Sequence, residues 1–311
     1  MPTHAAQQHV DGALSDFATA YSNSGFIADL VCPLVPTDKR SDKFFTRSRR
    51  DVSMIVNDLV GPKGRANEAS YDVGTDNFSV QDRALIDYVS AALKGNADAP
   101  LDPRELATQN LMQKLMLARE QRVATLMTTS GNYAPTNTAG ASAVWTNKTT
   151  ADPVADINEA IAAIPYAGED AELYGFCSRP VWNALRAHPA VIGLKGLTSG
   201  QATRAEVAEW FELSGLLVSD VWIDSANPGQ SASYARAWGN GFGIVRVPRQ
   251  LSGPDISAFA CTFRVDPGIQ VRAWDEPGIG VSGSEAIQVG FSDDEKIVQN
   301  DMGFLITGAV S

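Results

Sequence analysis

Cysteine and histidine are scarce in this chain of 311 residues, and their scarcity excludes several classes of function. The three cysteines are odd in number and show no C-x-x-C spacing, which argues against a disulfide framework or a zinc site. His4 and His9 lie close to the N-terminus, so a histidine-based triad or metal centre would depend on His188 alone. His188 adjoins Pro189 at a predicted helix end, where we expect it to interact with terminal carbonyls. The sequence thus predicts reduced thiols, a cytoplasmic folding compartment, and neither a metal nor a cofactor.

Long apolar runs and an excess of positive charge are missing as well. No apolar run approaches the length of a membrane span, and the N-terminus has no basic segment followed by an apolar one, so we expect no membrane association and no secretion signal. Acidic residues number 36 against 25 basic ones, a formal net charge of −11, which opposes a stand-alone nucleic-acid binder that neutralises phosphates. Hydrophobic residues make up 44% of the chain, which predicts an ordinary folded protein.

Nucleotide-binding and catalytic motifs are not found either. Residues 278–283 match the pattern G-x-G-x-x-G, but no βαβ unit surrounds them, so we expect a turn between strands. Gly239, Gly241 and Gly243 lack the Lys-Ser/Thr of a P-loop and are predicted to be bends. Acidic residues near a helix start, such as Asp152, complement the helix dipole. The chain is therefore not predicted to be an enzyme.

The most regular feature that is present is the segment 102–129, which reads as one spine helix of about seven turns. Asp102 fits the N-cap and Pro103 the first helical position. Apolar side chains recur at three- and four-residue steps and form one stripe: Met112, Leu115, Met116, Val123, Leu126 and Met127. Arg119 falls inside this stripe. Its guanidinium must either reach solvent over its own subunit or meet a carboxylate, which would come from another subunit.

Residues 1–45 are predicted to form an extended arm rather than a domain, with a short helix near residues 11–21. Pro33 and Pro36 exclude a helix and disfavour a central strand in the second half of the arm, because proline lacks a backbone donor. An arm of this kind must lie on another surface.

Residues 46–90 are polar and strand-like, which predicts a long two-stranded loop. An isolated hairpin is marginal in water, so this loop needs a neighbour such as another copy of the chain. Basic residues occur at its base and near its tip: Arg47, Arg49, Arg50, Lys63 and Arg65. Two interpretations of them stay open, a solvated charged surface or contacts with carboxylates of another subunit. Contact with nucleic acid is disfavoured, because aromatic residues are not interleaved with the basic ones.

A Gly/Asn/Thr-rich connection at 130–150 marks the best internal boundary. Beyond it, Asp152 and Pro153 open a predicted helix that ends before Pro165, and AELYGFCS is a predicted strand. Thr203-x-x-Glu206 is a capping box that opens another helix. The closing segments SAFACTFRV, IQVRAWDE and EAIQVGF alternate like antiparallel strands. This mixture predicts an α+β fold.

The order of these segments resembles that of the major capsid proteins of tailed bacteriophages, whose fold is that of the phage Hong Kong 97 shell. Their local sequences are also similar: FIADLVCPLVPTDKRSDKFF in the arm, NADAPLDP and LMLAREQRVATLM around the spine, and ADPVADINEAIAAI and VWNALRAHPAVIG in the second lobe. Each motif is structural and loose by itself, but together they follow the family's order over most of the chain.

The resemblance implies a capsid fold with an N-terminal arm (1–45), an extended β-hairpin loop (46–90), a peripheral domain with the spine helix (91–150 and 266–311) and an axial domain (151–265). It implies self-assembly through pentamers and hexamers into the icosahedral head of a virion, assembled in the host cytoplasm. Portal, scaffold and decoration proteins are the other implied partners, and double-stranded DNA would be packaged on the inner face without sequence-specific binding. An encapsulin-type compartment shell protein shares the fold and is the alternative.

The chain departs from some members of that family. Some carry a long N-terminal scaffold segment that is cleaved off, whereas here the arm begins almost at Met1, so we expect a separate scaffold or none. Others form Lys–Asn crosslinks from the extended loop. Lys63 is the candidate lysine, but no partner asparagine aligns, so we do not expect crosslinking. The basic residues of the loop, together with Arg119, are the expected assembly-interface residues.

Overall fold

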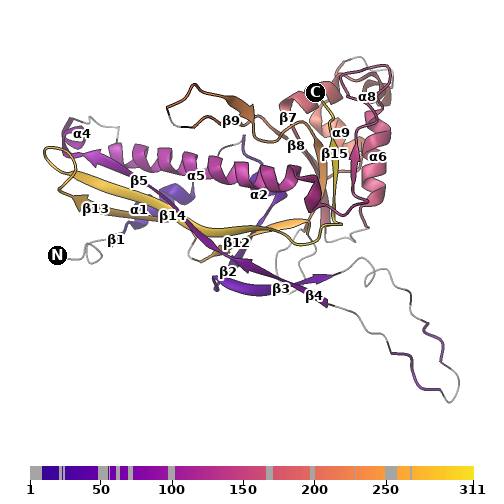
Figure 1. Cartoon of the computed structure of the whole chain (residues 1–311), viewed down its shortest axis with the longest axis horizontal. Coiled ribbons are helices and arrows are strands. Elements are labelled where there is room, and N and C mark those ends of the chain that lie inside the picture. Colours follow the sequence, from indigo (N-terminus) through magenta and orange to yellow (C-terminus); the bar gives the residue numbers. More distant parts are fainter. Residues whose placement is uncertain are drawn as a thin grey trace.

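The computed structural model describes residues 9–20, 23, 25–47, 55, 57–60, 64–68, 73–96, 102–165, 171–196, 200–227, 229–248, 258–266 and 268–311. Within these residues the chain forms an elongated part, built on a six-stranded sheet, and a compact lobe built on a five-stranded sheet (Figure 1). The mixed architecture confirms the predicted α+β class.

The elongated part is organised around one long strand. Its sheet consists of β1 (His9–Val10), β2 (Leu34–Thr37), β5 (Gln81–Ser90), β12 (Ala260–Val265), β13 (Gln270–Glu276) and β14 (Ser284–Ile297). β5 pairs along one edge of β14, and β13 and then β12 pair along the other, all antiparallel. β2 extends the sheet in parallel beyond β12. The glycine-rich segment 278–283 is the turn from β13 to β14, as predicted, and Gly280 and Gly283 have positive φ there.

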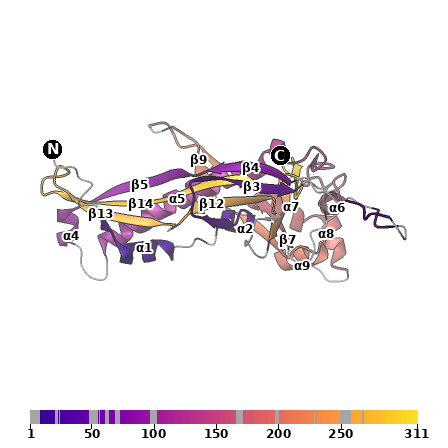
Figure 2. The same ribbon diagram turned by 90° about the horizontal axis from the view of Figure 1, so that it is seen from below.

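Helix α5 (Pro103–Thr128) is the predicted spine. The carboxylate of Asp102 accepts the backbone N–H of Arg104 at 2.8 Å, and Pro103 is the first helical residue, so both start signals are confirmed. Its 26 residues span about 39 Å along the sheet (Figure 2). Leu111 and Leu115 pack against Ile287 of β14, in a cluster that also includes Leu14 of α1 (Gly12–Thr19).

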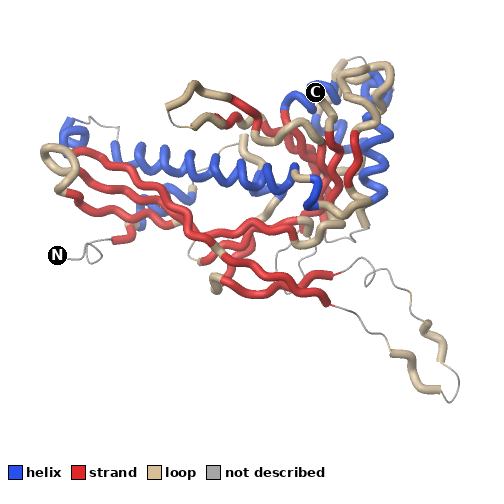
Figure 3. Tube along the Cα trace, in the orientation of Figure 1, coloured by secondary structure: helices blue, strands red, loops and turns tan. Residues whose placement is uncertain are grey.

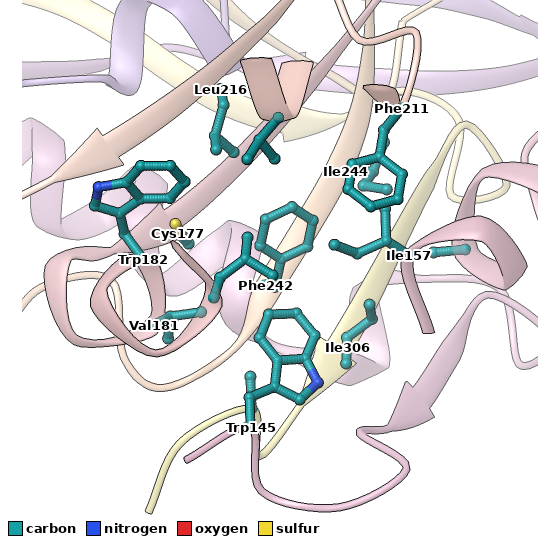
Figure 4. Packing of buried hydrophobic residues seen from close by; sticks show 14 of the residues in the cluster. Trp145, Ile157, Cys177, Val181, Trp182, Phe211, Leu216, Phe242, Ile244 and Ile306 are labelled. Atoms are coloured by element: carbon teal, nitrogen blue, oxygen red, sulfur yellow. The ribbon is translucent and has the colours of Figure 1, made fainter. Parts of the chain in front are cut away.

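The lobe places helices around a sheet of order β6-β15-β11-β7-β8. Its strands are β6 (Thr138–Gly140), β7 (Ala171–Ser178), β8 (Gly215–Ser219), β11 (Phe242–Pro248) and β15 (Gly303–Thr307). Its helices are α6 (Pro153–Ala163), α7 (Arg179–Arg186), α8 (Pro189–Leu194) and α9 (Arg204–Trp210). The helix predicted from Asp152 and the capping box of Thr203 with Glu206 are both confirmed. Trp145, Ile157 and Phe242 meet in the apolar core between sheet and helices (Figure 4).

The remaining elements connect or project from these two bodies. α2 (Ala28–Val31), α4 (Ala91–Asn96) and the 3-10 turn η2 (Ser130–Asn132) connect the larger elements. β3 (Ser41–Arg47) pairs with β4 (Val73–Ser79), and β9 (Trp222–Asp224) pairs with β10 (Tyr234–Arg236). In the view of Figure 3, the β3–β4 hairpin lies below the large sheet and the β9–β10 hairpin above α5.

Several sequence-based expectations differ from the structure. Residues 81–90 are not part of the projecting loop but form β5, whose backbone pairs with β14 and whose Val89 is buried. Gly243 is not a bend but lies within β11, where a Cβ would come within 2.1 Å of the Phe176 ring. The backbone N–H of His188 donates to the Leu185 carbonyl at the end of α7, but its imidazole has another role than the expected one. Because Pro189 starts a new helix, His188 is its N-cap, and its Nδ1 accepts the N–H of Ala190 at 3.3 Å.

Candidate assembly surfaces and the arm–spine junction

The projecting β3–β4 hairpin is fixed to the large sheet at its base. Phe44 of β3 and Phe78 of β4 are buried against Phe263 of β12, with ring centroids 5.2 Å and 4.4 Å apart. Such aromatic pairs add about 0.5–1.5 kcal/mol beyond the area they bury. The sequence did not reveal this anchor, because Phe44 and Phe78 come together only once the antiparallel register brings β3 and β4 side by side.

The part of the hairpin beyond its base exposes apolar and basic side chains. Ile55 is 96% exposed and Leu59 80% exposed. Arg47 is the last residue of β3, opposite Val73, and Arg65 is exposed. Arg49, Arg50 and Lys63, the other predicted interface residues, lie outside the described residues. Apolar side chains this exposed on a projecting hairpin are typical of a surface that another molecule covers.

Arg119 lies in the interior of the subunit instead of at an interface. Its side chain is 2% exposed, and its guanidinium forms an ion pair with Asp29 of α2 and a 3.1 Å hydrogen bond to Thr262 Oγ1. The expected contact with another subunit is therefore wrong, and so is the alternative of a guanidinium extended to solvent. The carboxylate that a buried arginine requires comes from the arm of the same chain.

Asp293 of β14 is a second buried charge beside Arg119. It is fully buried, and arginines from β5, α5 and β12 surround it: Arg83 at 3.2 Å, Arg122 at 3.4 Å, Arg264 at 3.2 Å and Arg119 at 4.0 Å. Burial raises the pKa of Asp293, the nearby Glu295 raises it further, and Arg122 and Arg264 oppose the shift. This cluster joins helix α5 to strands β5, β12 and β14 of the sheet through charge-assisted contacts.

Glu120 completes the junction between the arm, the spine and the lobe. Its buried carboxylate accepts the backbone N–H groups of Ile27 at 3.0 Å and Ala28 at 2.9 Å, and the indole N–H of Trp238 at 2.7 Å. It thus caps the start of α2 from another element, where α2 has no side-chain cap of its own. Burial raises the pKa of Glu120, against the effect of these hydrogen bonds. Glu120 was not among the residues predicted from the sequence, although its spacing from Met116 and Val123 places it in the apolar stripe.

The β9–β10 hairpin presents an aromatic side chain to solvent. Trp222 is 52% exposed, and the guanidinium of Arg236 lies 4.3 Å from its ring centroid. Arg236 forms an ion pair with Asp220, which also lies 3.5 Å from Arg179. These contacts hold the exposed ring in one position. Exposed aromatic and arginine side chains of this kind often dominate the binding energy of protein interfaces.

The described ranges contain neither a metal-ion cluster nor a membrane-spanning helix. Among the residues placed in the structure, no group of three His, Cys, Asp or Glu side chains is arranged to hold a metal ion. No helix within these ranges combines the length and the apolar character needed to cross a membrane.

Comparison with proteins of known sequence gives matches along almost the whole chain. The chain is 27% identical to the major capsid protein of Pseudomonas phage JBD67 over 307 aligned residues, and the alignment covers 97% of each protein. It is 24% identical over 253 residues to the major capsid protein of Burkholderia phage BcepMu, 78% of each. No family profile matches the chain.

Comparison with solved structures shows the same fold. A phage-related protein from Bordetella bronchiseptica superposes with a TM-score of 0.76 at 19% identity, covering 97% of this chain and 98% of that one. The capsid of Cyanophage P-SCSP1u gives a TM-score of 0.58 at 12% identity, covering 92% and 89%. An encapsulin complex from Synechococcus elongatus gives 0.53 at 11% identity, covering 95% and 94%. The fold is therefore that of phage capsid and encapsulin shells.

Proposed function

We propose that this chain, a tailed-phage major capsid protein with the Hong Kong 97 type of fold, assembles with itself into the icosahedral head of a virion. The observation that carries the proposal is the end-to-end sequence match to a phage major capsid protein, 97% of each chain, combined with a fold shared over nearly the same length. The function is structural and not enzymatic. The head would enclose double-stranded DNA, and a chain of net charge −11 fits packaging without tight or sequence-specific binding.

The parts of the chain take the following proposed roles. Residues 1–45 are the N-terminal arm, 91–150 with 266–311 the peripheral domain, and 151–265 the axial domain. Strands β6 and β15 are exceptions that pair in the sheet of the lobe, and β12 is an exception that pairs in the sheet of the elongated part. The extended loop was predicted at 46–90, but β5 pairs with β14, so we place the end of the loop at β4 and count residues 81–90 with the peripheral domain. Pentamers and hexamers are the proposed intermediates, with portal, scaffold and decoration proteins as further partners and the host cytoplasm as the place of assembly.

The loop is the proposed contact between neighbouring subunits. Its exposed Ile55 and Leu59 supply apolar area that has no cover within the described part of the subunit. The basic residues Arg47, Arg49, Arg50, Lys63 and Arg65 would meet carboxylates of an acidic neighbour, each exposed pair adding about 0.2–1 kcal/mol. Repetition over every subunit of the shell would make these small contributions decisive.

An encapsulin-type compartment is the other function that this fold serves. The likeness to the encapsulin complex is 11% identity, which shows the fold alone, whereas both sequence relatives above are phage major capsid proteins. We therefore favour the capsid.

Expression of the full chain followed by electron microscopy of the lysate tests the proposal. Closed icosahedral shells are expected, either from the chain alone or with the scaffold and portal genes of the same phage. Shells that form during infection should hold nuclease-protected DNA. Only small soluble species under every condition would refute the capsid role, and shells filled with a protein cargo in place of DNA would establish the compartment.

A further inference from the structure

The arm leads directly into the projecting hairpin. From α2 the chain passes through Pro33, whose carbonyl accepts the N–H of Thr262, into β2, which pairs with β12. Residues 38–40 connect β2 to β3, where the hairpin begins. Twelve residues, 29–40, therefore connect the segment that Glu120 holds to the start of the hairpin, and β2 lies among them.

We propose that Glu120 is a positioning residue for shell assembly, which sets the direction of the β3–β4 hairpin by fixing the start of α2 on the spine. The inference rests on the proposed capsid function. The hydrogen-bond partners of Glu120 lie outside the described residues of the hairpin, so we infer that it acts through α2 and β2. The neighbouring Arg119 contacts the same segment through Asp29 and the Cys32 carbonyl.

The geometry explains why a carboxylate is needed at this position. Ile27 and Ala28 each direct one N–H to a different oxygen of Glu120, so both oxygens must accept. A glutamine would place an amide N–H₂ against one of these donors, and one backbone N–H of the arm would lose its partner. Position 120 is fully buried, so water cannot accept the hydrogen bond of the unpaired N–H unless the surrounding residues rearrange. The expected result is an arm that shifts or detaches while the hydrophobic cores stay intact.

Two control variants separate this role from ordinary destabilisation. Val207→Ala removes two methyl groups from the apolar core of the lobe and leaves Glu120 and all its donors in place. Leu185→Ala opens a cavity in the lobe core, far along the chain from arm and hairpin, and lowers the thermal midpoint. Neither change should redirect the hairpin.

The experiment compares full-length wild type, Glu120→Gln, Val207→Ala and Leu185→Ala. Thermal melting is measured by circular dichroism, cleavage of the arm by limited proteolysis, and the subunit concentration at which half of the protein is in shells by light scattering and electron microscopy. For Glu120→Gln we expect faster cleavage of the arm and about a tenfold higher concentration for assembly, with open or irregular particles. The two controls should assemble near the wild-type concentration, even if their melting midpoints fall as far as that of Glu120→Gln.

Several outcomes would overturn the proposal. Glu120→Gln that assembles like wild type would show that the hairpin is aimed without this carboxylate. Controls that are impaired as much as Glu120→Gln would reduce its role to general stability. If Glu120→Gln does not fold, Asp29→Asn takes its place, because Asp29 is 61% exposed and its neutralisation should weaken the same docking with little effect on the core. Normal arm protection and assembly in that variant would then refute the inference. Failure of the wild type to form shells at all is a different result, which refutes the proposed function itself.

Discussion

In the lobe, the contacts that join sheet and helices are apolar, whereas in the elongated part buried charges join the arm, the spine and the sheet in addition to apolar clusters. The lobe core contains fully buried Trp145, Phe242 and Ile244. The junction instead buries Glu120, Arg119 and Asp293. Apolar contacts are non-directional and scale with the area removed from water. A buried ion pair adds little net stability but requires one arrangement of its partners. The comparison suggests that the lobe is built for stability and the junction for a defined orientation of arm and hairpin.

Removing the central carboxylate of the junction should have the largest effect on the free energy of unfolding. Asp293→Ala leaves the surrounding arginines without their shared partner, and breaking a buried charge cluster in this way costs about 3–5 kcal/mol. Asp294→Ala is the matched control, because this neighbouring carboxylate makes an exposed contact with the Ser79 N–H. Urea unfolding of both variants measures the difference. Equal, small losses would show that charge does not hold the junction.

The lobe offers the corresponding test of apolar packing. Gly243→Ala forces a methyl group to within 2.1 Å of the Phe176 ring, and such overpacking costs about 1–3 kcal/mol. Gly140→Ala in β6 is the control, because nothing lies within 4 Å of its added Cβ. Differential scanning calorimetry should show a lower midpoint for Gly243→Ala only. A midpoint that falls equally in both variants would point to backbone freedom and not to packing.

Local signals in the sequence predicted much of this fold. The start of α5 at Asp102 and the capping box at Thr203 depend on residues within a few positions of one another, so they can be recognised without the structure. β5 was missed because an edge strand with one half-covered face has only a weak apolar alternation. Its pairing with β14, which lies about 200 residues later, cannot be recognised from β5 itself.

The junction could be predicted only in part, for the same reason. The pattern placed Arg119 inside the apolar stripe and correctly required a carboxylate or an escape to solvent. The carboxylate belongs to Asp29, 90 residues earlier, and no local rule identifies it. Glu120 accepts from Ile27 over a separation of 93 residues. Such partners depend on how the arm crosses the spine, which is a property of the whole fold.

A smaller, pH-dependent effect on stability is expected from Glu206, a carboxylate near the surface of the lobe, in contrast to the buried Glu120. A hydrogen bond from the Thr203 N–H, with help from Lys195, lowers the pKa of Glu206 from 4.5 to about 2. A depressed pKa gives a stabilisation that is present above the ordinary value and is lost as the pH falls through the folded value. Glu206→Gln should thus lower the melting midpoint at pH 6 and have less effect at pH 2.5. The pKa of Glu120 shifts in the opposite direction, because burial raises it.

The smallest effect on the isolated subunit is expected from the basic end of the hairpin, which belongs to neither region. Arg47, Arg49 and Arg50 follow the anchored part of β3, and the apolar contacts of the hairpin come from Phe44 and Phe78. Reversing the arginines to glutamate should leave the melting midpoint of the subunit almost unchanged, because exposed pairs contribute about 0.2–1 kcal/mol each. The same change should prevent or weaken shell formation, since it replaces attraction to an acidic neighbour by repulsion. Wild-type assembly should also weaken with added salt, which screens these charges.

Circular dichroism melting alongside particle counts by electron microscopy tests this prediction, with Arg272→Glu as the control, a charge reversal on β13 away from the hairpin. A triple variant that unfolds or aggregates as a monomer would mean that these arginines support the fold of the subunit. A triple variant that assembles normally would identify them as a solvated surface. If the triple variant loses assembly at an unchanged melting midpoint while Arg272→Glu assembles normally, the hairpin stabilises contacts between subunits. The lobe core, by contrast, stabilises the fold of each subunit.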